Sequence, residues 1–280
     1  MATRREIYNL MYNTACELYD EGEARQIAEM LVLAKGNISR NDLIIEPNKE
    51  LIIEDLENII TELRDWRPVQ YIIGQAYFRD MELTVREGVL IPRPETEELV
   101  EWIASETVEG AKILDIGTGS GAIAIALSRE IENSKVWAMD ISREALAIAR
   151  DNGMCYAPNV TFVEGDALAD FDTLFEEHFD VVVSNPPYIP QSDDELMRKN
   201  VLDYEPPTAL FVPDNDPLLF YRSIARTAKK ILKPEGKLYF EIYERLAVEM
   251  LQMLEEEGYS DVTLREDFRG KPRMICATLQ

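Results

Sequence analysis

The segment Asn185-Pro186-Pro187-Tyr188 carries the side chains of this chain that point most directly to a chemical task. The side-chain carbonyl of Asn185 and the backbone carbonyl of Pro186 can together accept both N–H bonds of a planar NH2 group, because two consecutive prolines fix the direction of the backbone. The ring of Tyr188 can stack against the flat face of such a group. We therefore expect these four residues to hold an amide or an aromatic amine while an electrophile reaches its nitrogen.

A purely structural role would also account for part of this pattern. The segment follows an apolar run over residues 179–183 that reads as a buried strand. Two prolines can end such a strand, and Asn185 can cap the turn that follows. A second motif upstream makes this the weaker explanation.

That second motif is a glycine-rich loop after a predicted strand over residues 113–116. The loop reads Gly117-Thr118-Gly119-Ser120-Gly121 and runs into a predicted helix. Glycines at such positions let the backbone turn tightly and approach a ligand closely. The same pattern occurs in many nucleotide-binding folds, so the loop alone does not identify the ligand.

Acidic residues after the next two predicted strands narrow the choice of ligand. Asp140 ends the second strand, near the offset at which a ribose-binding carboxylate closes a first β-α-β unit. Asp166 and Ala167 follow the third strand. The glycine spacing differs from the pyrophosphate-binding fingerprint, and the acid Asp115 before the loop suits a cationic ammonium group better than a phosphate. The pattern therefore favours S-adenosylmethionine.

These motifs together resemble class I S-adenosylmethionine-dependent methyltransferases that act on amide or exocyclic nitrogen. Three further stretches narrow the resemblance to the peptide chain release factor glutamine N5-methyltransferases, the HemK/PrmC family. The resemblance rests on specific motifs from about residue 60 to the end, and before that on length and helical character alone. The three stretches are residues 67–74, 88–99 and 204–210.

The resemblance implies an enzyme that moves a methyl group from S-adenosylmethionine to the glutamine amide nitrogen (N5) of the Gly-Gly-Gln motif in class 1 release factors. S-adenosylhomocysteine would be the second product. The catalytic residues would be Asn185, Pro186 and Tyr188, which with Pro187 would also bind the substrate. Asp140 would accept the ribose hydroxyls and Asp166 would face the adenine amine. The whole cofactor-binding set would be Gly117, Thr118, Gly119, Ser120, Gly121, Asp140, Asp166, Ala167 and Asn185.

The chain departs from the family pattern at three places. It has Arg79-Asp80 after Phe78 where the family usually has Tyr-Gly, and Tyr243 where the family usually has glycine after Glu-Ile. Ala167 replaces an aromatic residue that often lies by the adenine. These departures concern the adenine contacts and the rim of the pocket, and they leave the expected reaction unchanged.

Composition excludes several other classes of protein. The formal net charge of −24 argues against a nucleic-acid-binding surface. It therefore disfavours the main alternative, an adenine N6-methyltransferase acting on DNA or RNA, which would also need room for a flipped base. A non-catalytic module that binds a nucleoside ligand is a further alternative, which the intact Asn185–Tyr188 segment disfavours. We expect no direct nucleic-acid binding.

Cysteine and histidine usage points to a reducing compartment and to chemistry without a metal. The three cysteines are widely spaced, and one histidine, His178, precedes a predicted strand. That pattern gives neither a disulfide framework nor a conventional zinc site. The N-terminal residues lack an apolar signal core, and no uncharged stretch reaches membrane-spanning length. We expect a cytoplasmic, monomeric protein with no membrane partner.

Hydrophobic periodicity predicts how these motifs are arranged. Apolar residues at three- and four-residue steps predict a helical bundle over residues 1–68, which we interpret as a substrate-recognition module. Residues 69–93 alternate as a β-hairpin linker. Residues 94–280 alternate strands and helices, which predicts an α/β fold: a class I methyltransferase-like doubly wound sheet, mostly parallel with an antiparallel end strand. This last part would be the S-adenosylmethionine-dependent methyltransferase domain.

Overall fold

The computed structural model describes residues 2–280, with only the backbone of Leu196, and the chain divides into two compact units. The first, a helical unit, comprises the chain up to Gln75 together with the segment Met197–Tyr204. The second, a sheet unit, comprises Ala76–Leu196 and Glu205–Gln280.

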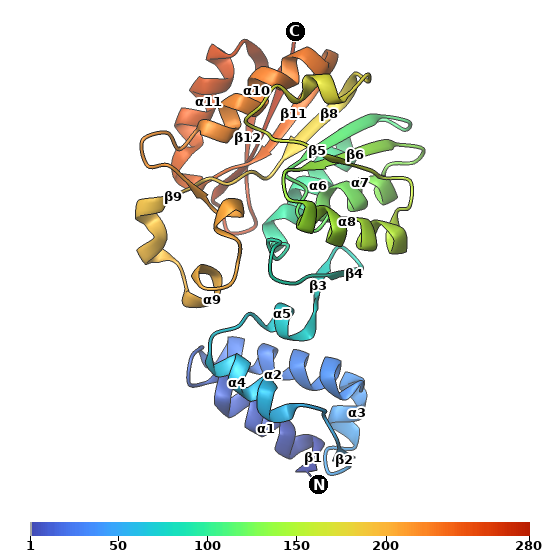
Figure 1. Ribbon diagram of the computed structural model, residues 1–280, viewed down its shortest axis with the longest axis vertical. Coiled ribbons are helices and arrows are strands. Elements are labelled where there is room, and N and C mark those ends of the chain that lie inside the picture. The colour runs from blue at the N-terminus through green and yellow to red at the C-terminus, as the bar shows by residue number, and fades with distance from the viewer. Residues whose placement is uncertain (1) are drawn as a thin grey trace. The chain divides into compact units, whose positions relative to one another are not determined.

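The helices of the first unit are shown in Figure 1. They pack around a small apolar core. Helix α1 begins at a capping box in which Thr3 and Glu6 bond each other's backbone N–H groups. Its residues Ile7, Met11 and Ala15 are buried because they recur on one face at the helical repeat. The elements of this unit are β1 (Ala2–Thr3), α1 (Arg4–Ala15), α2 (Glu21–Gly36), α3 (Arg40–Ile45), β2 (Glu50–Leu51), α4 (Leu56–Arg64), α5 (Val69–Ile73) and α9 (Lys199–Leu202).

The first residues of the predicted hairpin are helical instead. Val69 and Ile72 lie three positions apart and both pack into the core of the helical unit, so the apolar run forms helix α5. Gly74 then ends the helix with φ 89°. The hairpin itself is shorter than predicted and consists of β3 (Gln75–Phe78) and β4 (Met81–Thr84).

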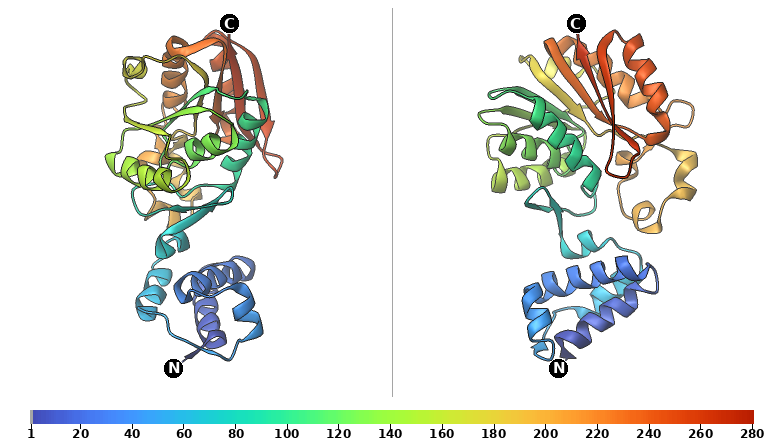
Figure 2. Two further views of the ribbon diagram at one scale, coloured as in Figure 1. Left: turned by 90° about the vertical axis from the view of Figure 1, so that its right-hand side faces the viewer. Right: turned by 180° about the vertical axis from the view of Figure 1, so that it is seen from behind.

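A seven-stranded sheet forms the centre of the second unit, in the order β12-β13-β11-β8-β5-β6-β7 (Figure 2). The strands β11, β8, β5, β6 and β7 are parallel. The antiparallel strand β13 pairs with β11 on one side and with the edge strand β12 on the other. The strands are β5 (Lys112–Ile116), β6 (Lys135–Asp140), β7 (Thr161–Glu164), β8 (Phe179–Ser184), β11 (Leu232–Glu241), β12 (Tyr259–Glu266) and β13 (Pro272–Leu279).

Helices cover both faces of this sheet (Figures 1 and 2). Successive residues of a strand point to opposite faces. Accordingly, Val181 and Val183 of β8 pack with helices α6 and α7, whereas Val182 packs with α10 and α11. The helices are α6 (Pro94–Glu106), α7 (Ala122–Glu130), α8 (Arg143–Tyr156), α10 (Leu219–Ile231) and α11 (Ala247–Glu256). This is the predicted doubly wound arrangement.

The segment between β8 and α10 contains only short elements. Strand β9 (Ile189–Pro190) pairs in parallel with β10 (Phe211–Val212), which returns the chain to the end of β8. The 3-10 turns Gln191–Leu196 and Pro207–Ala209 lie between them. The hairpin strand β4 is anchored separately, because the amide of Asn152 bonds both the N–H and the carbonyl of Thr84.

None of the helices within residues 2–280 is long and apolar enough to cross a membrane. Over the same residues, His, Cys, Asp and Glu side chains form no group that would hold a metal ion.

Candidate active site

The carboxyl ends of the parallel strands bring the sequence motifs together. Ile116 at the end of β5 pairs with Ser184 at the end of β8, and the Ser184 hydroxyl donates to the Ile116 carbonyl at 2.7 Å. On the other side of β5, Ile116 pairs with Met139, so Asp140 lies one residue past this pair. Ligands of open α/β sheets bind at this edge. The glycine loop, Asp140 and Asn185 therefore lie next to one another at this edge of the sheet.

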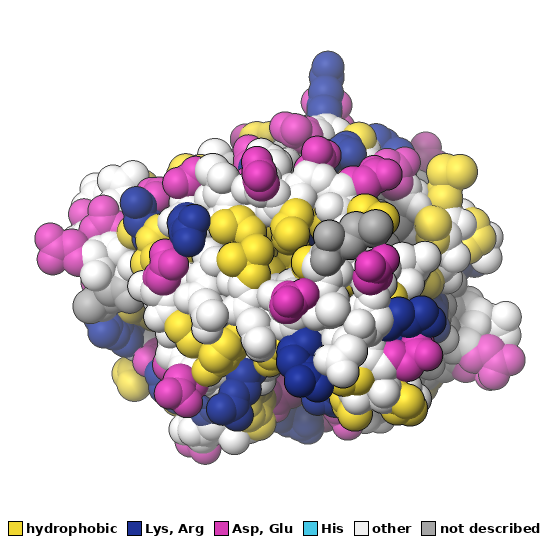
Figure 3. Space-filling view, turned by 90° about the horizontal axis from the view of Figure 1, so that it is seen from below, with side chains coloured by type: hydrophobic (Ala, Val, Ile, Leu, Met, Phe, Trp, Pro, Cys, Tyr) yellow, Lys and Arg dark blue, Asp and Glu magenta, His cyan; other side chains and the backbone are white. Residues whose placement is uncertain are grey.

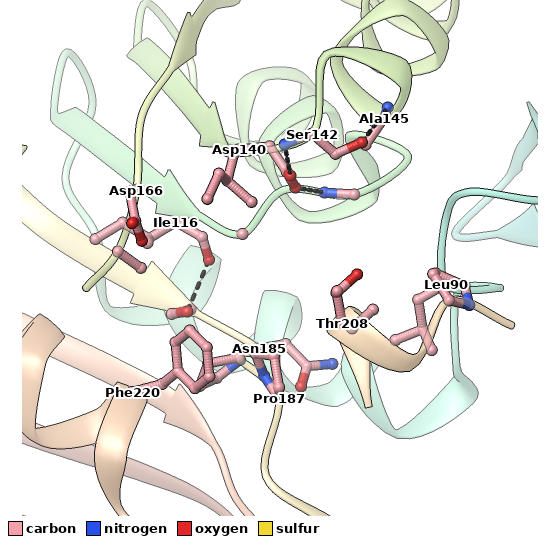
Figure 4. Close-up of a pocket in the computed structure, with 18 of the residues that line it drawn as sticks. Leu90, Ile116, Asp140, Ser142, Ala145, Asp166, Asn185, Pro187, Thr208 and Phe220 are labelled. Carbon is pink, nitrogen blue, oxygen red and sulfur yellow. Dashed lines mark hydrogen bonds between the residues drawn. The ribbon is translucent and has the colours of Figure 1, made fainter. Parts of the chain in front are cut away.

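A cavity of about 420 Å³ lies there (Figure 4), a size usual for small-molecule sites. Figure 4 shows Asp140 and Ser142 on one side of it and Asn185, Pro187 and Phe220 on the other. Among the residues predicted for the site, those that line it are Gly117, Gly119, Asp140, Asp166, Ala167, Asn185, Pro186 and Pro187.

Gly117 and Gly119 present bare backbone to the cavity. Both have positive φ, 73° and 57°. A Cβ atom added to either would meet nothing within 4 Å, so the space beside both residues is open to a ligand. The backbone there can approach a ligand more closely than it could with side chains in between.

The other loop residues, Thr118, Ser120 and Gly121, do not line the cavity and instead hold the loop in shape. The Thr118 hydroxyl donates to Asp115 at 2.6 Å. The Ser120 carbonyl accepts a hydrogen bond from Asn152 of α8 at 2.9 Å. Gly121 has a φ of 86°, and a Cβ there would also lie 2.9 Å from the Ile125 side chain and 3.3 Å from that of Ala149, so both backbone and packing favour glycine.

Asp115 is fully buried and lies outside the cavity lining. One of its oxygens accepts hydrogen bonds from Thr118 Oγ1 and from the backbone N–H of Ala124. Burial raises the pKa of this carboxyl to about 7, because few groups compensate the charge. Asp115 therefore supports the glycine loop from behind, and the preference of this position for a ligand with an ammonium group stays a prediction.

Asp140 faces the cavity with part of its acceptor capacity free. Its two oxygens accept the backbone N–H groups of Gly119 and Ser142, each at 2.9 Å (Figure 4). A carboxylate offers about four acceptor positions, so each oxygen can take one further hydrogen bond. Burial raises the pKa of Asp140 above its ordinary value.

Asp166 and Ala167 form another part of the wall, beside apolar residues that the sequence did not indicate. One Asp166 oxygen accepts the Leu168 N–H at 2.8 Å, which fixes the turn. The Ala167 carbonyl accepts from the Ser223 hydroxyl at 2.7 Å. Phe220 of α10 lines the same cavity and supplies an aromatic ring where Ala167 cannot.

Tyr188 differs from its three neighbours, because it does not line the cavity. Its hydroxyl donates to Glu241 at 3.3 Å, and its ring stacks on Tyr243 with the centroids 5.9 Å apart and the planes at 14°. Burial and the nearby Glu241 carboxylate raise the pKa of the Tyr188 phenol. The ring that we expected against the substrate amide therefore packs behind the segment.

Residues from two distant stretches complete the cavity. They lie in the stretches 88–99 and 204–210 or directly after them. Because both stretches carry the family resemblance, that resemblance could have identified them as site residues. The buried carboxylate of Glu205 joins the two stretches, accepting the Ile91 N–H at 3.1 Å and Arg93 Nη2 at 2.6 Å. The additional lining residues from this region include Gly88, Val89, Leu90, Pro206, Thr208, Ala209 and Phe211.

Comparison with known proteins agrees with this geometry. A family described as a methyltransferase domain matches residues 107–268. The release factor glutamine methyltransferase of Bacteroides thetaiotaomicron is 47% identical over 266 residues, which cover 93% of this chain and 95% of the relative. That of Flavobacterium psychrophilum is 42% identical over 266 residues, covering 92% and 93%. The chain belongs to the release factor glutamine methyltransferase family.

A solved structure supports the fold independently. A methyltransferase from Pyrococcus furiosus matches with a TM-score of 0.53 at 21% identity, over 71% of this chain and 88% of that one. This likeness concerns the fold alone. With the sheet order, it confirms the predicted class I methyltransferase-like architecture, and family membership confirms that the chain is a methyltransferase.

Two of the departures from the family pattern have a clear structural role. Arg79 and Asp80 both adopt positive φ, 39° and 46°, in the turn between β3 and β4. That conformation suits the glycine usual in the family at position 80, and here Arg79 adds an ion pair with Glu130. Tyr243 supports the ring of Tyr188, and its hydroxyl donates to Asp193 at 2.6 Å.

Proposed function

We propose that this enzyme transfers a methyl group from S-adenosylmethionine to the side-chain amide nitrogen (N5) of the glutamine in the Gly-Gly-Gln motif of a class 1 peptide chain release factor. The observation that carries the proposal is that Asn185 and Pro186 line the same cavity as Gly117, Gly119 and Asp140. One cavity can thus bring the substrate nitrogen held by Asn185 and Pro186 close to a cofactor held by the glycine loop and Asp140. The family to which the chain belongs supports the identity of the substrate.

The residues of the cavity fit S-adenosylmethionine, which supplies an electrophilic methyl group on sulfur when bound. The open acceptor positions of Asp140 suit the two ribose hydroxyls. Asp166 would accept the adenine amine, with the apolar side chain of Phe220 nearby to contact the adenine ring. The bare backbone of Gly117 and Gly119 would let the amino-acid part lie close.

Asn185 and Pro186 would do the work on the substrate. An amide nitrogen is a weak nucleophile, because its lone pair is shared with its carbonyl. The Asn185 and Pro186 oxygens accept both N–H bonds of the amide and so aim its nitrogen at the methyl carbon. They also stabilise the positive charge that develops on the nitrogen as the N–C bond forms and the C–S bond breaks. The nitrogen then loses a proton, for which a water molecule suffices, leaving S-adenosylhomocysteine and the methylated amide.

The helical unit would provide a second contact for so large a substrate. Helix α3 has no buried residue, and Ile44 and Ile45 on it are 67% and 75% exposed. Ile44 also lines a hollow of about 430 Å³ together with Tyr8 and Pro47. Figure 3 shows a face of the molecule on which hydrophobic side chains lie beside acidic and basic ones. We assign the release factor to the surface of helix α3 around Ile44 and Ile45.

One assay tests the proposed reaction. The purified enzyme would be incubated with methyl-labelled S-adenosylmethionine and one of three substrates: a release factor, the same factor with the glutamine of Gly-Gly-Gln changed to alanine, or DNA. We expect label on the unchanged factor only, mapped to that glutamine by mass spectrometry. Equal labelling of the alanine-containing factor, or labelling of DNA, would contradict the proposal.

A further inference from the structure

Two successive hydrogen bonds connect Asn185 of the active site, through Thr96, to the buried Glu241. Asn185 Nδ2 donates to the hydroxyl of Thr96 at 3.5 Å, and the Thr96 hydroxyl donates to Glu241 Oε2 at 2.6 Å. Thr96 is in the first turn of α6, and Glu241 is the last residue of β11. Both are nearly inaccessible to solvent, with 4% and 2% exposed. Neither residue lines the cavity.

The orientation of the Asn185 amide matters for the proposed reaction. An asparagine side chain ends in a carbonyl oxygen, which accepts hydrogen bonds, and an NH2 group, which donates them. A substrate NH2 group needs the oxygen. If the Asn185 amide turned over, its own NH2 would face the substrate NH2, and two donors would meet without an acceptor.

The Thr96 hydroxyl discriminates between these two orientations. A hydroxyl has one proton to donate, and the short bond to Glu241 uses it. Only lone pairs of Thr96 Oγ1 then remain to face Asn185. They attract its NH2 group and repel its carbonyl oxygen, which leaves Oδ1 free for the substrate.

Glu241 is held so that it accepts this hydrogen bond. Its second carboxylate oxygen accepts the hydroxyl of Tyr188 at 3.3 Å, and its backbone carbonyl accepts the hydroxyl of Tyr221 at 3.0 Å. Thr96 and Tyr188 thus both donate to a buried carboxylate. Burial raises the pKa of Glu241, while the Thr96 hydroxyl and the charge of Arg273 oppose this rise. In its ionised form the carboxylate only accepts, so it imposes a direction on both hydroxyls.

We propose that Thr96 and Glu241 are positioning residues that set the Asn185 amide with its oxygen toward the substrate. The inference rests on the proposed function, since it assumes that a substrate amide is bound by Asn185 Oδ1. The contact between Asn185 and Thr96 is long, as such contacts often are before substrate binds, and it shortens when substrate engages Oδ1.

The central test compares Thr96→Val, which keeps the shape and removes the hydroxyl, with Thr96→Ser, which keeps the hydroxyl. Single-turnover methyl transfer to the release factor should fall about 10-fold in the valine variant, the effect of one lost hydrogen bond, and stay within about threefold in the serine variant. Affinity for S-adenosylmethionine, measured by calorimetry, should be unchanged in both. Equal turnover of the valine variant and the unchanged enzyme would overturn the proposal.

A double-mutant cycle separates positioning from a general structural effect. If Thr96 acts through Asn185, then Thr96→Val should cost nothing further in an Asn185→Ala background. The same fold-loss in both backgrounds would show that Thr96 acts elsewhere and would refute the inference. Glu241→Gln serves as a second variant should the valine variant fail to fold, because its amide can donate to Thr96 as well as accept from it. We expect it to lose turnover about as Thr96→Val does.

A readout without substrate keeps this inference distinct from the proposed function. The side-chain NH2 protons of Asn185, followed by nuclear magnetic resonance, should exchange with water more slowly in the unchanged enzyme and in Thr96→Ser than in Thr96→Val. Identical exchange in all three would refute the orientation proposed for Asn185. An enzyme with the expected exchange pattern that leaves release factors unmethylated would instead refute the proposed function alone.

Discussion

The backbone N–H of Gly119 donates to Asp140 Oδ2 at 2.9 Å, which ties the glycine loop to the carboxylate at the end of the neighbouring strand. The bond crosses from the loop after β5 to the last residue of β6. Asp140 therefore has two tasks: it shapes the loop that a cofactor would approach, and it presents acceptor positions to the same cavity.

Replacing Asp140 should consequently weaken S-adenosylmethionine binding. We expect Asp140→Ala to cost about 1–3 kcal/mol of binding free energy through lost hydrogen bonds, as measured by calorimetry. Asp140→Asn keeps one acceptor oxygen, so its loss should be smaller. Unchanged affinity in the alanine variant would disprove the ribose assignment.

Asp115 should make the stability of the fold depend on pH. Its pKa of about 7 in the folded protein lies above the ordinary value of 3.8, so the folded state holds the proton more tightly than the unfolded state. The stabilisation is fully present below about pH 4 and is lost as the pH rises toward 7. Over that range the contribution of this one group amounts to up to about 4 kcal/mol.

Asp115→Asn would remove this titration while keeping the shape of the side chain. Urea unfolding at a series of pH values between about 4 and 7 should show a smaller decline of the unfolding free energy in the variant than in the unchanged protein. Buried carboxyls that do not interact with Asp115 contribute equally to both proteins, so the difference reports Asp115 and its electrostatic interaction with Asp140. Parallel curves for the two proteins would contradict the assignment.

Tyr188 should act through the shape of its segment. Tyr188→Phe removes only the 3.3 Å hydrogen bond to Glu241 and keeps the stacking on Tyr243, so turnover and Tm should change little. Tyr188→Ala removes the ring from a packed site, and both Tm and turnover should fall together. An alanine variant with an unchanged Tm and no turnover would instead indicate direct contact between the ring and the substrate.

The proposed release factor surface can be tested without removing the helical unit. Ile44→Glu combined with Ile45→Glu places charges on an exposed surface and should leave Tm and cofactor affinity unchanged. KM for the intact release factor should rise several-fold, because apolar area is lost from the interface. The matched control is Val248→Glu, at a residue of the sheet unit that is 73% exposed. An equal rise of KM in the control would contradict the surface assigned here.

Local patterns in the sequence were sufficient to predict the fold class and to identify the principal motifs. Alternating apolar strands and helices imply a doubly wound sheet, and the ends of parallel strands must meet at one edge. That rule alone places the glycine loop, Asp140 and Asn185 together. The proline pair that aims a carbonyl, and the glycines that leave room for a ligand, are likewise readable within a few residues of the chain.

Packing between distant residues decided the rest. The predicted hairpin linker began at residue 69, yet Val69–Ile73 form a helix because Val69 and Ile72 pack into the core of the helical unit. Tyr188 turns away from the cavity because Glu241 and Tyr243 offer it a hydrogen bond and a stacking partner. Neither partner is near in sequence.

The contact that orients Asn185 in our proposal is the clearest example of a feature that depends on residues distant in sequence. Thr96 and Glu241 are 145 positions apart in the chain, and neither stretch of sequence indicates that the two side chains meet. Periodicity and motif spacing describe neighbours along the chain, whereas a buried hydroxyl chooses its acceptor among the groups that folding brings around it. The sequence therefore indicates which side chains could take part in the reaction. The tertiary structure alone determines which distant residues hold those side chains in position.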